Sequence, residues 1–217
     1  MMIWRMKALR MNKGTLFIFS APSGTGKFTV LKRILNCFSY LKYSISATTR
    51  QPRDCEQDSV HYYFYTKEHF METLNNDGFL EHTKYIDNYY GTPKKPVFKW
   101  LDEGYDVILE IEVDGAKKIK TFMPEAVSIF MLPPSKEELL NRLKKADTGL
   151  RNDIELRYSV AIEEMKQAYF YDYVVINDDL ENAVLAVKSI IIANRQKADN
   201  MGKIIDGVIG NVESEYN

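Results

Sequence analysis

Short apolar runs alternate with longer amphipathic stretches along most of this chain of 217 residues. The apolar runs predict buried strands, and the stretches with apolar residues three or four positions apart predict helices. This alternation indicates an α/β fold with a parallel sheet flanked by helices, in which ligands bind at the carboxyl ends of the strands. The predicted strands are Leu16–Ser20, Tyr43–Ser46, Tyr105–Ile111, Ala126–Leu132 and Tyr173–Ile176. The predicted helices are Lys27–Phe38, Val113–Phe122, Ser135–Lys145, Ile154–Tyr169 and Leu180–Lys197.

The pattern changes between Thr48 and Pro96, where short aromatic-rich pieces surround a helix predicted near Lys67–Asn75. We therefore expect an inserted lobe with its own small sheet. The polar segment Lys144–Asp153 joins two predicted helices and is expected to be a mobile cover. The stretch after Lys197 has weaker periodicity, which is compatible with a last helix or with a loosely held tail.

Composition narrows the function classes. No apolar run approaches the roughly 20 residues of a membrane span, so we expect no membrane role. The formal net charge is -1 and the basic residues are scattered, which argues against a long nucleic acid as partner. Cys37 and Cys55 lack metal-ligand spacing and are too few for a disulfide framework, so we expect reduced thiols in the cytoplasm. A homo-oligomer is compatible with this composition.

The first predicted strand breaks into a glycine-bearing turn that ends in a lysine, Ala21-Pro22-Ser23-Gly24-Thr25-Gly26-Lys27. Gly24 and Gly26 let the backbone approach a polyanion, and the following helix aims its free N–H groups and positive dipole end at phosphate. Lys27 would neutralise the outer phosphates of a nucleotide. The alternative is an ordinary strand–helix connection with a solvated lysine.

This turn departs from the pattern G-x-x-x-x-G-K-[ST] at both ends. Ala21 replaces the first glycine, and Phe28 stands where a hydroxyl should bind magnesium. Thr29 would not simply replace that hydroxyl, because the next helical position points about 100° away. We hypothesise that Phe28 slows or weakens the use of magnesium-ATP and that water completes the metal shell.

Two arginines, Arg50 and Arg53, follow the second predicted strand on either side of Pro52. Each guanidinium offers a fork of donors that matches phosphate oxygens, and its charge persists at any working pH. Two arginines near a proline on a surface loop usually bind nothing. Their spacing alone therefore leaves phosphate binding and a solvated loop as open alternatives.

Several motifs, taken in order, resemble the guanylate kinase family over nearly the whole chain. The motifs are Ser46–Arg53 with Glu56, Tyr62, Asn88–Thr92, Ile108–Gly115, Pro133–Ser135 before the helix with Arg142, Arg157, and Val175–Asp179. The resemblance implies a P-loop kinase core (13–47 and 97–197), an inserted mixed α+β GMP-binding lobe (48–96), a small lid (144–155) and a C-terminal tail (198–217). It also implies a nucleoside monophosphate kinase that transfers the γ-phosphoryl group of ATP to GMP with Mg²⁺, giving ADP and GDP.

The same resemblance implies a role for each site residue. The catalytic residues would be Lys27, Arg50, Arg142 and Arg157. ATP would be bound by Ala21, Pro22, Ser23, Gly24, Thr25, Gly26, Lys27, Phe28, Thr29 and Asn177. GMP would be bound by Ser46, Arg50, Arg53, Glu56, Tyr62, Glu81, Tyr90, Thr92 and Glu112. Glu110 would lie near the metal and its waters.

Residue chemistry agrees with most of these roles. A carboxylate at Glu81 can accept two bonds from the N1–H and amine of guanine, whereas the N1 acceptor of adenine would be repelled. Glu112 stands where the family usually has aspartate, so its side chain is one methylene longer. Arg142 and Arg157 would brace charge on the migrating phosphoryl group, and no covalent step is expected.

Two other functions are compatible with parts of the sequence. A guanylate-kinase-like module that holds a peptide or protein is favoured by Phe28, by Ala146 where the family often has a lid arginine, and by Cys55 in place of a usual glycine. A kinase for another small phosphate, such as a ribose phosphate, would not need the guanine-reading residues. The many convergent cations favour the active enzyme.

Overall fold

The computed structural model describes residues 13–85, 87–145 and 154–213. Its main sheet has five strands in the order β2-β7-β1-β8-β9, and every neighbouring pair is parallel. This confirms the predicted α/β class and the parallel sheet. The strands are β1 Leu16–Ser20, β2 Leu41–Tyr43, β7 Asp106–Glu110, β8 Val127–Leu132 and β9 Tyr173–Ile176.

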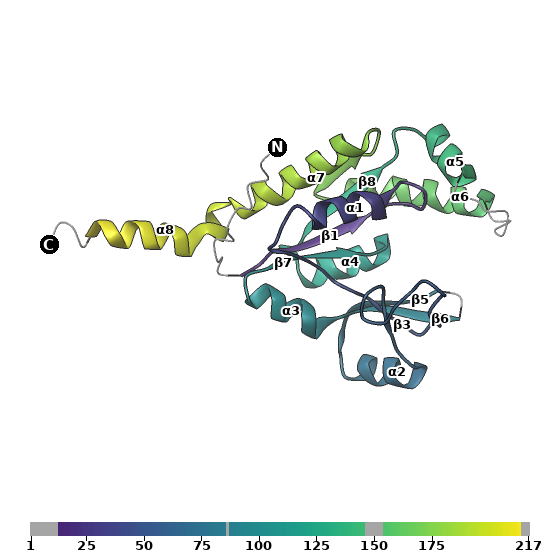
Figure 1. The fold of residues 1–217 in the computed structure, drawn as a ribbon, viewed down its shortest axis with the longest axis horizontal. Helices are drawn as coiled ribbons and strands as arrows, with labels where there is room; N and C mark the ends of the chain where they lie inside the picture. The colour runs from purple at the N-terminus through teal and green to yellow at the C-terminus, as the bar shows by residue number, and fades with distance from the viewer. Residues whose placement is uncertain (1–12, 86, 146–153, 214–217) are drawn as a thin grey trace.

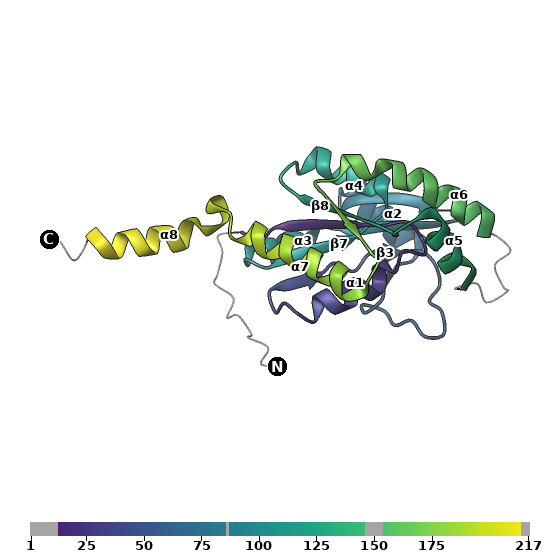
Figure 2. The ribbon, with the colours of Figure 1, turned by 90° about the horizontal axis from the view of Figure 1, so that it is seen from above.

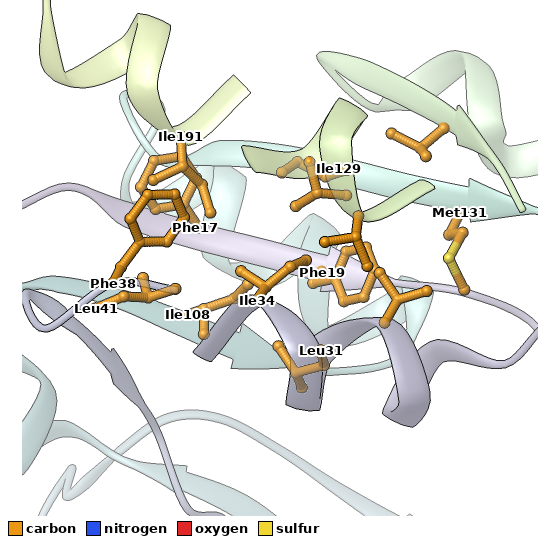
Figure 3. Close-up of a cluster of buried hydrophobic side chains, with 14 of the residues drawn as sticks. Phe17, Phe19, Leu31, Ile34, Phe38, Leu41, Ile108, Ile129, Met131 and Ile191 are labelled. Carbon is orange, nitrogen blue, oxygen red and sulfur yellow. The ribbon is translucent and has the colours of Figure 1, made fainter. Parts of the chain in front are cut away.

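Helices cover both faces of this sheet (Figures 1 and 2). On one face, α1 (Lys27–Leu35) and α7 (Leu180–Arg195) pack over Phe17 and Phe19, and Figure 3 shows these rings pointing toward Ile34 and Ile191. On the other face, α3 (Lys94–Asp102) and α4 (Val113–Phe122) pack over the alternate side chains of β1. Each large side chain buried in these layers contributes about 1.5–3 kcal/mol.

Three predicted helices end early, and one helix was not predicted. α7 ends at Arg195 instead of Lys197. α1 ends at Leu35 instead of Phe38, because Phe38 turns away from the helix to pack into the core. α6 (Ile154–Met165) tightens into a 3₁₀ turn, Lys166–Phe170, before the predicted end. α3 was not predicted because it contains Pro96, which is tolerated in a first helical turn where its missing N–H would have no partner.

Ser135 caps the start of α5 (Lys136–Lys145). The Ser135 hydroxyl accepts a hydrogen bond from the Glu138 N–H at 3.1 Å. α5 and α6 lie at the end of the molecule remote from α8 (Ala198–Glu213), which projects away from the body (Figures 1 and 2). The stretch after Lys197 is therefore largely a helix. Residues 146–153 of the predicted lid, which include Ala146, and residues 214–217 lie outside the described residues.

A second sheet has four strands in the order β4-β3-β6-β5. Its core is small and centres on Phe70 of α2 (Lys67–Asn75), whose ring stacks on Phe79 with centroids 4.4 Å apart. Figure 1 shows this sheet and α2 beside the α4 face of the main sheet. Its strands are β3 Ala47–Thr48, β4 Tyr63–Phe64, β5 Phe79–Tyr85 and β6 Asn88–Pro93.

The predicted strand Tyr43–Ser46 is wrong at both ends: β2 begins at Leu41, and beyond Tyr43 the chain changes sheets. β2 ends at Tyr43, and the Ser44 N–H still donates to the Ile108 carbonyl of the main sheet at 3.1 Å. The Ser46 carbonyl instead accepts from the Tyr63 N–H of the second sheet at 2.9 Å.

Within the three described ranges no helix has both the length and the apolar character that crossing a bilayer requires.

Candidate functional site

A cleft of about 680 Å³ lies between the start of α1 and the second sheet. It opens at the carboxyl end of β7, where ligands are expected in a parallel sheet. Residues from both sides contribute to one continuous wall. The predicted site residues that line it are Lys27, Phe28, Ser46, Glu56, Tyr62, Glu81, Tyr90, Glu110 and Glu112.

The turn of residues 21–27, called the phosphate turn because we expect it to bind phosphate, has positive φ angles at both of its glycines. Gly24 and Gly26 have φ angles of 86° and 85°, a region that costs other residues strain. A Cβ atom at Gly26 would also lie 2.9 Å from the Asn177 Nδ2. Gly26 caps α1 without any side-chain hydrogen bond, so the helix start is open to an anion.

Side chains hold the rest of the turn by donating hydrogen bonds to its backbone carbonyls. The buried Thr25 hydroxyl donates to the Pro22 carbonyl at 2.8 Å, and the Thr25 carbonyl accepts from Asn177 Nδ2 at 2.6 Å. Ala21 is half-buried, whereas Ser23, Phe28 and Thr29 are exposed. Phe28 is 66% exposed, and its apolar ring lines the cleft together with Lys27.

Two of the predicted arginines reach this turn from α5 and α6. Arg142 donates to the Asn177 carbonyl at 3.0 Å and to the Thr25 carbonyl at 3.4 Å, while Glu138 accepts from its Nε at 2.9 Å. Arg157 donates through Nη2 to the Ser23 hydroxyl at 2.8 Å. Its Nη1 is buried and has no hydrogen-bond partner among the described residues, which leaves a donor for an anion.

Glu110 ends β7 and is held from two sides. One carboxylate oxygen lies 3.4 Å from the Lys27 ammonium, and the other accepts a 3.1 Å hydrogen bond from the Tyr43 hydroxyl. Burial, and then the charge of Glu110, raises the pKa of Tyr43, so the phenol stays protonated and donates. No cluster of three metal-ligating side chains occurs in the described part of the chain. A single carboxylate nevertheless fits Mg²⁺, which usually keeps waters and binds substrate phosphates.

Arg50 is paired with Glu56 on the second-sheet side. The guanidinium donates to both carboxylate oxygens, at 2.8 and 2.9 Å, and this pair lowers the pKa of Glu56 to about 2. Arg50 also lies over the Tyr62 ring, 5.5 Å from its centroid, and Tyr62 packs edge-on against Tyr90. Arg53 donates its backbone N–H to Glu56. Neither Arg50 nor Arg53 lines the cleft itself, although Glu56, Tyr62 and Tyr90 around Arg50 do.

Glu81 is the buried carboxylate of the cleft, with 8% of the residue exposed. The Thr92 hydroxyl donates to one of its oxygens at 2.6 Å. Burial raises the pKa of Glu81, while the bond from Thr92 and the charge of Lys118 oppose this shift. Ser46 and Glu112, which precedes α4, line the same wall.

Sequence reasoning missed three residues that shape the site: Tyr43, Gly115 and Lys118. A Cβ atom at Gly115 would lie 3.1 Å from a Glu81 oxygen, so only glycine leaves that carboxylate its place. Gly115 and Lys118 are three apart on α4 and share a face. A glycine inside a predicted helix, followed one turn later by a cation, was the available signal.

Comparisons with known proteins agree with the geometry. A family model described as guanylate kinase matches residues 13–194. A guanylate kinase of Caldanaerobacter subterraneus is 49% identical over 187 residues, covering 86% of this chain and 91% of that protein. One from Clostridioides difficile is 45% identical over 193 residues, covering 89% of this chain and 94% of that protein. The crystal structure of a guanylate kinase from Anaplasma phagocytophilum is similar with a TM-score of 0.73 at 28% identity, covering 92% of this chain and 97% of that one.

Proposed function

Because this chain belongs to the guanylate kinase family, we propose that it transfers the γ-phosphoryl group of ATP directly to GMP across the cleft described above. It is a nucleoside monophosphate kinase, and its products are ADP and GDP. The observation that carries the proposal is the single cleft wall that joins Lys27 and Glu110 to Tyr62, Tyr90 and Glu81. One end offers cationic and backbone donors for a polyphosphate, and the other offers phenols and a buried carboxylate for a nucleoside monophosphate.

We assign ATP to the phosphate turn. The open start of α1 and the ammonium of Lys27 would hold the outer phosphates, and Asn177 would keep the turn in shape through Thr25. Glu110 would hold Mg²⁺ together with the phosphates and water. When bound, the ion neutralises charge on the phosphate oxygens.

We assign GMP to the second sheet. Arg50, with Tyr62 and Tyr90 around it, would bind the phosphate dianion, which can replace Glu56 as the partner of the guanidinium. Glu81 would accept the two guanine donors, with its second-sheet partner Thr92 fixing one oxygen. The other residues assigned to the GMP site are Ser46, Arg53, Glu56 and Glu112.

Transfer needs alignment more than bond-making by the protein. The phosphoryl group would pass in line between the two substrates, so the enzyme positions them and stabilises spread-out negative charge. Arg142 and Arg157 are placed for this because both contact the phosphate turn and Arg157 retains a spare buried donor.

The remaining assignments follow from the same family pattern. We assign residues 48–96 to a GMP-binding lobe on a core of residues 13–47 and 97–197, and residues 144–155 to a lid. We also infer a cytoplasmic location, because Cys37 and Cys55 are free, exposed thiols, which fit a reducing compartment. A protein-binding module and a kinase for another small phosphate are not favoured, since the curated relatives are guanylate kinases.

A nucleotide panel with the purified protein tests the proposal. ADP formation from ATP should depend on GMP and should be far slower with AMP, CMP, UMP or ribose 5-phosphate. The control variant Lys27→Met should lose the activity and keep its thermal unfolding temperature. Tight GMP binding without turnover would instead support a binding module, and turnover of ribose 5-phosphate would support another kinase.

A further inference from the structure

Lys118 of α4 lies next to the guanine-facing carboxylate but belongs to no assigned site. Its ammonium donates to the backbone carbonyl of His82 at 2.9 Å, which joins α4 to β5 directly after Glu81. Lys118 and Glu81 both line the main cleft, and both line a second cavity of about 360 Å³ behind β5. The two side chains therefore share one wall between two cavities.

The positive charge of Lys118 matters because burial and a nearby carboxylate oppose the ionisation of Glu81. The carboxylate is buried, and Glu112 adds a second negative charge from the start of α4, so both effects oppose ionisation. Thr92 offsets part of this through its hydrogen bond. Lys118 is the cation on the cleft side that acts on Glu81.

The second cavity supplies no strong additional counter-charge. Lys94 lines it, but its ammonium is paired with Asp77 at 2.6 Å. The pKa of His82 is lowered by burial and by Lys118, so this imidazole is mostly neutral near neutral pH. Burial raises the pKa of Glu81 and the Thr92 hydrogen bond lowers it; among the charged groups, Lys118 then favours the ionised carboxylate and Glu112 opposes it.

We propose that Lys118 is a specificity-determining residue of the GMP site, whose ammonium, tied to the His82 carbonyl, provides a positive charge beside the Glu81 carboxylate that faces guanine. This inference rests on the proposed function. A carboxylate presents two acceptors to the N1–H and amine donors of guanine. A protonated carboxyl group places a donor against a donor, which costs affinity for GMP. Lys118 acts through Glu81, so its effect should appear in GMP binding and not in ATP binding.

The test compares Lys118→Met, Lys118→Arg and the control Lys117→Met, whose lysine lies one position earlier on α4 and donates to Gln167 instead. KM for GMP and KM for ATP are measured from about pH 5.5 to pH 8. Without the ammonium the pKa of Glu81 rises, so the protonated fraction at a given acidic pH grows. We expect KM for GMP in Lys118→Met to rise about three- to tenfold near pH 6, and less near pH 8, because one pKa unit corresponds to a factor of ten.

Lys118→Arg should restore the wild-type profile, since the charge remains, and Lys117→Met should match the wild type. In a Glu81→Gln background, which has no carboxylate to titrate, Lys118→Met should lose its pH-dependent effect. An equal rise of KM for GMP at every pH, or an equal rise of KM for ATP, would overturn the proposal in favour of a purely structural tie to His82.

Calorimetric binding of GMP at about pH 6 and pH 8 separates this inference from the proposed function. If the wild type binds GMP but does not phosphorylate it, the proposed function fails. The pH dependence of GMP binding in Lys118→Met still tests the role of Lys118. If Lys118→Met binds GMP with the wild-type pH dependence, the inference fails whatever the activity.

Discussion

The phosphate turn and the second sheet hold their binding groups in different ways. In the turn, Asn177 and Arg142 donate to main-chain carbonyls, and the turn itself sits on the large core around Phe19. In the second sheet, charged side chains hold one another, as Arg50 holds Glu56, over a core whose fully buried residues are Ala47, Phe70 and Phe79.

This difference fits the two substrates. Main-chain groups and helix N–H groups at the turn would hold a polyphosphate in one fixed place, with Lys27 beside them. Side-chain pairs can exchange partners, so Arg50 would leave Glu56 for a phosphate and Glu81 would accept a base. We therefore expect the turn to provide position and the second sheet to provide the choice of acceptor. The four predictions below test this division, beginning with the largest effect.

Lys27→Met, which removes the cation of the phosphate turn, should abolish most of the turnover. We expect kcat/KM to fall by about a thousandfold or more, because a cation on the transferring phosphoryl group acts in the transition state. The unfolding temperature should change little, since a partly exposed ion pair such as Lys27 with Glu110 adds little stability. Steady-state kinetics and thermal unfolding measure both quantities. A loss smaller than tenfold would place the main phosphate cation elsewhere.

Glu81→Gln, a substitution on the second sheet, should weaken the binding of GMP alone. The amide offers a donor where guanine needs an acceptor, so we expect KM for GMP to rise about a hundredfold. KM for ATP should stay within about twofold, because Glu81 lies on the second sheet and not in the turn. Equal changes in both constants would break the proposed division between the two regions.

Gly115→Ala should shift the same carboxylate without changing its chemistry. The added methyl group would lie 3.1 Å from a Glu81 oxygen, so the side chain must move. We expect KM for GMP to rise about tenfold, because small misplacements at a reacting site are costly. Gly210→Ala is the matched control, since no atom lies within 4 Å of the added methyl group, and it should leave both KM values unchanged.

Phe28→Ser should produce the smallest effect, and it should be a gain. A hydroxyl at the start of α1 can donate its oxygen to magnesium, so the concentration of Mg²⁺ needed for half-maximal rate should fall about two- to threefold. Titrating Mg²⁺ at saturating ATP and GMP measures this. If both the turnover and the apparent magnesium affinity are unchanged, the hypothesis about Phe28 is wrong.

The two regions also differ in how far the sequence predicts them. The turn lies within a few consecutive residues, so glycine spacing and an adjoining apolar strand were enough to predict it and its backbone. The residues proposed to bind GMP are scattered from Ser46 to Glu112, and no local pattern joins them. Their grouping could be predicted only through the family resemblance.

The errors in the predicted fold have physical causes as well. Four strands of the main sheet were predicted because they are mostly apolar, but the strand predicted at Tyr43–Ser46 shares only Tyr43 with β2, and Ser44 and Ser46 bond to different sheets. α3 was missed because its proline masks a helix start. Tyr43 and Lys118 act through contacts between distant segments, and periodicity carries no information about those contacts.

Direct transfer requires two anion sites that face each other across one cleft. A bisubstrate analogue, adenosine and guanosine joined by five phosphates, tests this arrangement by calorimetry. We expect one molecule bound per chain, at least about a hundredfold more tightly than GMP alone, with the gain lost in both Lys27→Met and Arg50→Ala. Binding no tighter than that of either nucleotide alone, or unaffected by one of these variants, would contradict it.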